Sequence, residues 1–320
     1  MRLHVVALDG VFDTGLSTVL DAFGTANELA EMTGVTSLRF QVTIAGVRRA
    51  PRTSQGLRVP VENAADLAAP DWAIVPAIGH KMPGPLAAAL ASREVRDVGE
   101  LLRHWASRGA NTAAACIGTF VVAESSLLDG EDATTTWWLA PMFRKRYPRV
   151  RLDESRIVVP SHRVLTAGAA LSHLDLALSL IRQASPELAA LTTRYLVVDA
   201  RTSQAIYAVP HQLAHADPLV GRFERWARES LGQGFALEGA ARALGTSKRT
   251  LARRMHDVLG KTPLEYFQEL RVERAVHLLK TTGASIDQIA AQVGYADGVS
   301  LRALLRRRLK CGVRELRGRA

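Results

Sequence analysis

One thiol lies at a position from which side chains of enzymes often act as nucleophiles. Cys116 follows the small apolar residues 113–115, which have the pattern of a strand, and it precedes Ile117 and the start of a predicted helix. At such a strand-to-helix turn the side chain projects outward, beside backbone N–H groups that lack helical partners. A second loop, which contains His80, follows the apolar strand of residues 72–75. Because ligands in open α/β sheets bind beyond the carboxyl ends of strands, both loops are candidates for a binding site.

The chemistry of Cys116 depends on whether a base stands beside it. A thiol with a pKa of about 8.5 is only a few per cent thiolate at neutral pH, so hydrolysis by a cysteine needs a positioned base. His80 is the candidate base. The alternative is that Cys116 is a small buried residue that shapes a ligand pocket, and that His80 belongs to a loop or to the core. We favour this second interpretation.

Cationic side chains gather on two predicted helices in the last third of the chain. A helix with a small polar start and arginines along its length suits the DNA major groove, because its first side chains reach base edges and its long cationic ones reach phosphates. A charged face turned to solvent is the commoner alternative. Because the pattern occurs twice, we predict DNA contacts from both helices, by Lys248, Arg249, Thr250, Arg253 and Arg254 on the first and by Ser300, Arg302, Arg306 and Arg307 on the second.

Apolar residues around the two cationic helices form a repeat that would position them. Spacings of three and four residues predict amphipathic helix-turn-helix pairs within residues 237–259 and 286–309. The pairs superpose at an offset of 49 residues before the turn and 50 after it. Gly245 and Gly294 stand where the chain needs a positive φ to leave the first helix of each pair.

A long helix is predicted between the two pairs. Thr262 and Glu265 form a capping box at its start, the helix ends at residues 282–283, and Ser285 and Gln288 form a second capping box for the next helix. A helix of about 18 residues spans about 27 Å, which would hold the two cationic helices roughly one DNA turn apart.

These features resemble the DNA-binding domain of AraC/XylS-type transcription regulators. The resemblance covers about a third of the chain, departs from the family where leucine replaces phenylalanine at 301, 305 and 309, and is carried by residues 247–251, 260–266, 271–275 and 289–295. It implies a transcription regulator, usually an activator, that binds double-stranded DNA, with RNA polymerase as a further candidate partner.

Composition bounds these interpretations. The 320 residues predict two domains, and residues 218–320 contain 20 Lys and Arg against 10 Asp and Glu, whereas the rest contains 21 of each. The whole net charge of +10 therefore lies where phosphates would be met. Two distant cysteines exclude a disulfide framework and a cysteine-based metal cluster. With no secretory pattern and no long apolar run, we expect a cytoplasmic protein and no membrane contact.

The first two thirds of the chain alternate between strand and helix patterns. Strands are predicted at 3–8, 40–44, 72–75, 113–115, 157–159 and 164–166, and helices at about 16–26, 85–91, 95–108, 119–126, 171–183 and 187–200. The alternation predicts an α/β domain with a mostly parallel, flavodoxin-like sheet flanked by helices, followed by an all-α domain with two helix-turn-helix motifs. The predicted boundaries are 1–185 for the sensor domain, 186–217 for a bridging helix and linker, and 218–320 for the DNA-binding domain.

Residues 3–183 are similar to the PfpI-type branch of the class I glutamine-amidotransferase-like superfamily. The similarity is carried by residues 21–27, 75–76, 115–120, 127–130 and 133–137. Enzymes of that branch use an elbow cysteine with a histidine and an acidic neighbour. The resemblance puts Cys116 at the elbow and Asp21 at the acidic position, but Thr136 stands where the histidine is expected. It therefore implies no catalytic residues, and an effector pocket lined by Asp21, Gly79, His80, Cys116, Ile117 and Trp137.

Together the two resemblances imply a homodimeric regulator that senses a small molecule, needs no cofactor or metal, and is not an enzyme. Such regulators usually control the catabolism of small nitrogen compounds. The alternative is a PfpI-type cysteine hydrolase or hydratase with a DNA-binding appendage. The threonine at 136 argues against this alternative.

Overall fold

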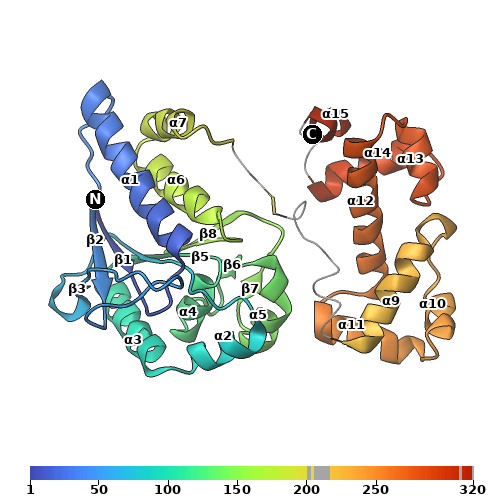
Figure 1. Ribbon diagram of the computed structural model, residues 1–320, viewed down its shortest axis with the longest axis horizontal. Helices are drawn as coiled ribbons and strands as arrows, with labels where there is room; N and C mark the ends of the chain where they lie inside the picture. The colour runs from blue at the N-terminus through green and yellow to red at the C-terminus, as the bar shows by residue number, and fades with distance from the viewer. Residues whose placement is uncertain (200–202, 205–216, 310–311, 319–320) are drawn as a thin grey trace. The chain divides into compact units, whose positions relative to one another are not determined.

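A computed structural model describes residues 1–199, 203–204, 217–309 and 312–318, and the chain divides into two units, residues 1–204 and 205–320 (Figure 1). The first unit is a layered α/β structure, and the second is helical. None of the described helices combines the length and the apolar character needed to cross a membrane. Residues 200–202 and 205–216, which belong to the bridging helix and linker predicted at 186–217, and Cys311 lie outside the described residues.

A seven-stranded sheet forms the middle of the first unit. Its order is β3-β2-β1-β4-β5-β9-β8, and all neighbouring strands are parallel except β8 and β9. The strands are β1 (Arg2–Val6), β2 (Gln41–Gly46), β3 (Glu62–Asn63), β4 (Trp72–Val75), β5 (Asn111–Ala115), β8 (Val158–Ser161) and β9 (Val164–Ala167). A separate parallel pair consists of β6 (Asp132–Ala133) and β7 (Arg151–Leu152). After β1 the chain continues to β2 on one side of the sheet, and after β4 it continues to β5 on the other side. The loops that follow β1 and β4 therefore meet at the switch point where such sheets bind ligands.

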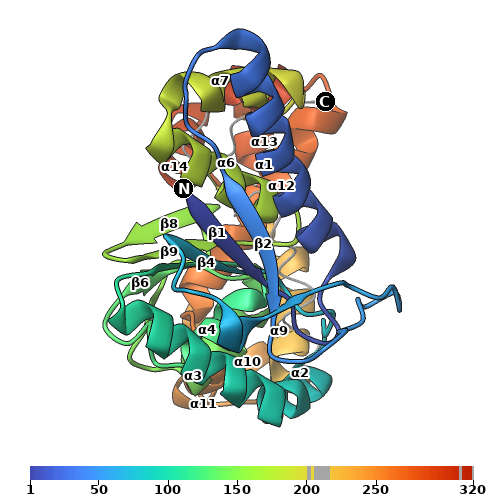
Figure 2. The ribbon, with the colours of Figure 1, turned by 90° about the vertical axis from the view of Figure 1, so that its left-hand side faces the viewer.

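Helices cover both faces of this sheet (Figure 2). One face carries α1 (Asp13–Thr33), α6 (Ser172–Ala184) and α7 (Pro186–Tyr195), which pack on one another. The other carries α2 (Pro83–Leu90), α3 (Arg93–Ser107), α4 (Gly118–Glu124) and α5 (Ala140–Arg146). Short 3₁₀ turns are η1 (Ala64–Asp66) and η2 (Trp137–Leu139).

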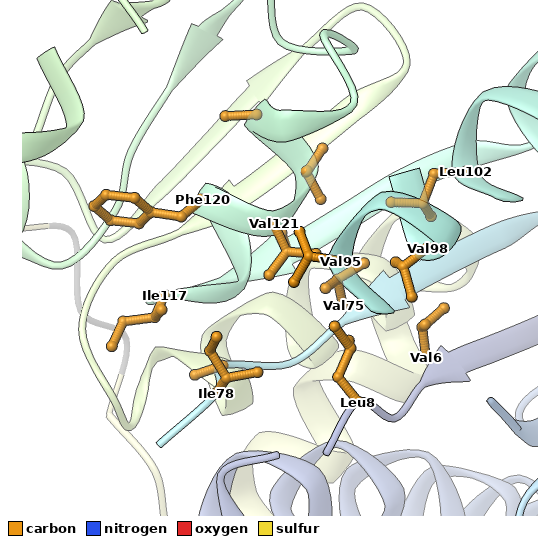
Figure 3. Packing of buried hydrophobic residues seen from close by; sticks show 14 of the residues in the cluster. Val6, Leu8, Val75, Ile78, Val95, Val98, Leu102, Ile117, Phe120 and Val121 are labelled. Atoms are coloured by element: carbon orange, nitrogen blue, oxygen red, sulfur yellow. The ribbon is translucent and has the colours of Figure 1, made fainter. Parts of the chain in front are cut away.

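Each face of the sheet has its own apolar core. Alternate residues of a strand enter opposite cores, so that Val6 and Val75 pack with α2, α3 and α4, whereas Val5 and Ile74 pack with α1 and α6 (Figure 3). Burial on both faces explains why β1 and β4 are continuous apolar runs rather than alternating ones.

The predicted fold class is confirmed. The six predicted strands correspond to β1, β2, β4, β5, β8 and β9. The prediction missed β3, β6 and β7, which are two residues long and too short to show a period, and it also missed α5. The helix predicted at 187–200 is shorter than expected, because α7 ends at Tyr195; residue 200 lies outside the described part.

The second unit contains two helix-turn-helix pairs and a long helix between them, as predicted. Gly245 and Gly294 have φ of +63° and +78°, and both capping boxes, at Thr262 with Glu265 and at Ser285 with Gln288, are present. The elements are α9 (Pro218–Glu229), η4 (Leu231–Gln233), α10 (Leu237–Ala243), α11 (Lys248–Leu259), α12 (Pro263–Thr281), α13 (Ile286–Gln292), α14 (Gly298–Leu309) and α15 (Val313–Gly318).

Arg271 of α12 joins the two halves of this unit. Its guanidinium is buried, with the residue 5% exposed, and donates through Nε (3.2 Å) and Nη2 (3.0 Å) to the carbonyl of Leu231 in η4. The guanidinium carbon also lies 4.8 Å from the ring centre of Phe267 and 5.1 Å from that of Tyr295, the latter from the second pair. At Gly294 a Cβ would lie 2.2 Å from Nη2, so a side chain there would displace the guanidinium. One side chain thus fixes η4, α12 and the second pair together.

We predict that Arg271→Met lowers the free energy of unfolding of the second unit by about 1.5–3 kcal/mol, the range for buried hydrogen bonds that involve a charged group. The variant keeps the apolar stem but leaves the Leu231 carbonyl without its donors. Hydrogen exchange of the α12 amides measures the effect within this unit. Arg274→Met, at an exposed position of the same helix, is the control and should change stability by less than about 0.5 kcal/mol. Equal effects of the two substitutions would contradict the role of Arg271.

Candidate nucleic-acid interface and elbow site

The exposed face of α11 carries most of the cationic side chains predicted to contact DNA. Lys248, Arg249 and Arg253 are exposed. Thr250 is half-buried, and its N–H donates to Oγ of Ser247 (3.0 Å), which caps the helix. The first turn therefore presents Lys248 and Arg249 as exposed cationic side chains on a capped helix start.

Arg254 has a structural partner that the sequence did not reveal. Its guanidinium pairs with the buried carboxylate of Asp217, which also accepts two backbone N–H groups at the start of α9. Desolvation raises the pKa of Asp217, but these hydrogen bonds and the guanidinium outweigh it and hold the pKa below its usual value. Arg254 therefore makes an α9–α11 contact, and its predicted contact with DNA stays a prediction. Lys248 lies 3.5 Å from Glu238 in an exposed pair that water and salt weaken.

The exposed face of α14 carries the second set of predicted residues. Ser300, Arg302, Arg306 and Arg307 are all exposed. Asp297 accepts the backbone N–H of Ser300 (2.7 Å) and so fixes the first turn of the helix, as Ser247 does in α11. Each of the two helices thus has a side-chain cap and an outward row of polar and cationic residues.

A groove of about 490 Å³ lies between the start of α12 and one side of α14. Within it the Tyr295 hydroxyl donates to Oε1 of Gln268. Its lining residues are Leu264, Glu265, Gln268, Tyr295, Ser300, Ala303, Leu304, Arg307 and Arg308. Arg307 therefore faces the groove side of α14 and not the side that carries Arg302.

Cys116 forms the turn between β5 and α4 that the sequence predicts. Its φ is +56°, and its N–H donates to the carbonyl of Ala167 in β9 (2.9 Å). Gly118 lets the turn approach the end of β4, because a Cβ at this position would lie 2.2 Å from the carbonyl oxygen of Val75. The elbow is therefore held close against two neighbouring strands.

The thiol of Cys116 is protonated at neutral pH. The residue is 3% exposed, and burial raises the pKa of the thiol to about 12. The backbone N–H of Ile117, the hydroxyl of Thr136 and the ammonium group of Lys81 lower this pKa, but by less than burial raises it. The hydroxyl of Thr135 donates to the carbonyl of Cys116 (2.7 Å). These neighbours fix the elbow without activating its sulfur.

Asp21 does not face the sheet, so its predicted place in the effector pocket is corrected. It is exposed on α1, because the helix turns Val19, Ala22 and Phe23 toward the sheet and Asp21 falls on the opposite side. Gly15, in the first turn of α1, packs against His173, because a Cβ there would lie 2.6 Å from Nε2 of that residue.

The other predicted pocket residues lie in two loops and in the core. Gly79 and His80 are half-buried, and the N–H of Gly79 donates to the carbonyl of Gly10 (2.7 Å). Ile117 (Figure 3) and Trp137 are buried. Within the described residues no hydrogen bond joins His80 to the thiol, and no group of three or more His, Cys, Asp or Glu residues is placed to hold a metal ion.

His173, which the sequence did not indicate as a functional residue, is fully buried at the start of α6. Its Nε2 accepts the N–H of Ala77 (3.1 Å), so Nδ1 carries the proton and donates to the carbonyl of Ala170 (2.5 Å). Burial lowers the pKa of the imidazole to about 4, so it is neutral at pH 7 and ties the loop after β4 to α6. A single histidine in the first turn of an amphipathic helix gives no sequence signal for this role.

Gln204, the last residue of the first unit, is a second residue that the sequence did not indicate. The residue is 1% exposed, and its Nε2 donates to the carbonyls of Thr135 (2.9 Å) and Arg156 (3.2 Å), while Oε1 accepts the N–H of Ala169 (3.0 Å). Because Thr135 in turn bonds to the Cys116 carbonyl, two hydrogen bonds connect the end of the first unit to the elbow. The residues around Gln204 have no periodic pattern of apolar side chains, so the sequence gives no sign that its amide is buried and hydrogen-bonded.

Two family profiles match the chain. The profile of the DJ-1/PfpI family matches residues 1–183, and a profile described as a helix-turn-helix domain matches residues 240–319.

Known proteins with similar sequences are regulators by name. The HTH-type transcriptional regulator GbdR of Pseudomonas aeruginosa is 28% identical over 200 residues, which are 61% of this chain and 54% of that protein. The HTH-type transcriptional regulator ArgR of the same species is 28% identical over 205 residues, which are 63% of this chain and 62% of that protein. The chain thus aligns with little more than half the length of these curated relatives.

The fold of the first unit recurs in a solved structure. An AraC family transcriptional regulator from Pseudomonas putida superposes with a TM-score of 0.51 at 19% identity, over 61% of this chain and 98% of the other. Because the DJ-1/PfpI profile spans more than half of the residues, the protein belongs to the DJ-1/PfpI family and adds to that domain a helix-turn-helix domain of the AraC type.

Proposed function

We propose that this protein is a sequence-specific transcription regulator that binds double-stranded DNA through α11 and α14. The observation that carries the proposal is the pair of capped helices, each with exposed cationic side chains: Lys248, Arg249 and Arg253 on α11, and on α14 Arg302 and Arg306, with Arg307 on the side of the groove. A lone charged face would be a solvated surface, but two on repeated helix-turn-helix frames match the geometry that fills successive major grooves. The excess of cations in residues 218–320 supplies the phosphate attraction.

The first unit acts in this proposal as a sensor and not as an enzyme. The thiol pKa of about 12 leaves almost no thiolate at neutral pH, and the neighbouring position 136 offers a hydroxyl where a base would be needed. A small molecule would bind near the elbow, with Gly79, His80, Cys116 and Ile117 at the site. Thr119 Oγ1, buried in the first turn of α4, has no hydrogen-bond partner within the described chain and is a group that such a ligand could satisfy.

The proposal has three further parts. The protein forms a dimer through its first unit, it activates transcription through RNA polymerase, and it is located in the cytoplasm. The resemblance to AraC/XylS-type regulators supports them. The division into residues 1–185, 186–217 and 218–320 stays a prediction; α7 packs on α1 and α6, and Asp217 begins the helical part of the second unit.

The proposal predicts specific and salt-sensitive DNA binding by the full chain. Fluorescence anisotropy with promoter fragments of the source genome should show affinity that falls steeply between about 50 and 200 mM salt. Arg249→Ala and Arg302→Ala should each cost about 1–3 kcal/mol on the preferred sequence, if each arginine contacts a base in a bidentate manner. Arg108→Ala, an exposed arginine of the first unit, removes the same charge and should cost little. Failure to bind any fragment at low ionic strength would refute the proposal.

Coupling between the elbow and the end of the first unit predicts an effect of Gln204→Ala. Loss of its amide leaves the carbonyls of Thr135 and Arg156 without this donor, so amides around residues 134–136 should exchange hydrogen about tenfold faster or more, the effect of about 1.4 kcal/mol. Ser203→Ala, which removes an exposed hydroxyl bonded to the Ser155 carbonyl, is the matched control and should leave exchange at 134–136 unchanged. Exchange by mass spectrometry that fails to separate the two variants would argue against the coupling.

Buried Cys116 predicts a chemically inert thiol. In a Cys311→Ser background, which leaves Cys116 as the sole thiol of the two in the sequence, a disulfide reagent such as DTNB should react at pH 8 at least about a hundredfold more slowly with the folded protein than with the protein in guanidinium. Cys116→Ala should also leave any turnover of simple amides or aldehydes unchanged. Fast labelling of the folded chain, or turnover that depends on Cys116, would favour the hydrolase or hydratase alternative.

A further inference from the structure

The two helices proposed to contact DNA differ in the second residue of their first turn. Ser247 and Asp297 occupy the same place, because each accepts a backbone N–H from the third residue of its own helix. The second residues are therefore equivalent, and they are Arg249 in α11 and Val299 in α14. The same outward position therefore carries a guanidinium in the first helix-turn-helix pair and an isopropyl group in the second.

Val299 makes little contact with its own chain. It is 69% exposed, which is more than any other large apolar residue of α14, and the groove beside α14 is lined by Ser300 and Ala303 and not by Val299. Spacings of three and seven residues put Val299, Arg302 and Arg306 in one outward row of the helix. A single exposed valine is ordinary on a protein surface. Here it shares its row with the cations that the proposed function places at the duplex.

An aliphatic side chain can recognise only one feature of the major groove. Base edges there present hydrogen-bond donors and acceptors, which valine cannot pair with, and one apolar group, the 5-methyl of thymine. Residues in the first turn of such a helix are the ones that reach base edges. Arg249 at the equivalent place has the opposite chemistry and suits the acceptors N7 and O6 of guanine.

We propose that Val299 is a specificity-determining residue that recognises a thymine through its 5-methyl group, in the part of the site bound by α14. This inference rests on the proposed function, since it requires that α14 enter the major groove. It makes the two half-sites chemically different: the α11 half requires a base with acceptors at the position of Arg249, and the α14 half requires a methyl group at the position of Val299.

The test removes the methyl group from the DNA and the isopropyl group from the protein. The probe is the duplex that the full-length protein selects from a randomised library, with each thymine replaced in turn by deoxyuridine, which lacks only the 5-methyl. The wild type should lose about fourfold in affinity at one thymine of the α14 half-site, which corresponds to about 0.8 kcal/mol for one buried methyl-sized group. Val299→Ala should bind the thymine and uracil forms of that duplex equally.

Leu264→Ala is the matched control, because Leu264 is also an exposed apolar residue but lies on α12. It should keep the wild-type preference for thymine. Circular dichroism should show that Val299→Ala is folded, as the exposure of Val299 leads us to expect. Binding without any uracil-sensitive position in the α14 half-site, or a sensitivity that persists in Val299→Ala, would overturn thymine recognition alone. Absence of binding to every duplex would overturn the proposed function as well.

Discussion

The geometry of the second unit depends on one buried guanidinium. Apolar contacts between helices tolerate sliding, whereas Arg271 makes two directed hydrogen bonds to one carbonyl and stacks near two aromatic rings, which together permit a single arrangement. The helix that carries it has 19 residues and is therefore about 28 Å long. With a stiff helix and a fixed joint, the separation of α11 and α14 is set by the protein itself. Arg254, paired with Asp217, fixes α11 to α9 in a similar way, so arginines in this unit serve both packing and the surface.

In the first unit, the buried side chains of Cys116, His173 and Gln204 are neutral. The thiol of Cys116 is protonated, and the imidazole of His173 is held in its neutral form by a backbone donor on one nitrogen and a backbone acceptor on the other. The buried amide of Gln204 is likewise satisfied by backbone groups. Buried neutral groups with complete hydrogen bonding rigidify a site and do not drive proton transfer. The elbow is thus built to hold its shape and to connect, through Thr135, with the end of the unit.

Sequence patterns predicted the features that arise from periodicity and local chemistry. The central strands, both capping boxes, the two turn glycines and the elbow at Cys116 all have a local cause, and Leu301, Leu305 and Leu309 stay buried although they replace larger residues. Long-range partners were not predictable. Asp21 was placed by resemblance, yet the period of α1 turns it outward. Arg254 carries the same signal as its exposed neighbours, and only Asp217, 37 residues away, distinguishes it. Gln204 and His173 act through atoms of distant loops, which no local pattern encodes.

Comparison of the two helix-turn-helix pairs in the second unit distinguishes residues needed for packing from residues available to a partner. Equivalent core positions keep their character, as in Leu251 with Leu301 and Leu259 with Leu309, all of which are buried. Equivalent outward positions do not: α11 has Lys248 and Arg249 in its first turn, whereas the first turn of α14 has no Lys or Arg and its cations follow from Arg302 onward. Packing does not explain the difference, because the equivalent core positions of the two pairs are buried in the same way. Two unlike surfaces at a fixed separation fit an asymmetric duplex in one direction only. A regulator of this kind would therefore be oriented on DNA by its own surface, before any second subunit or effector acts.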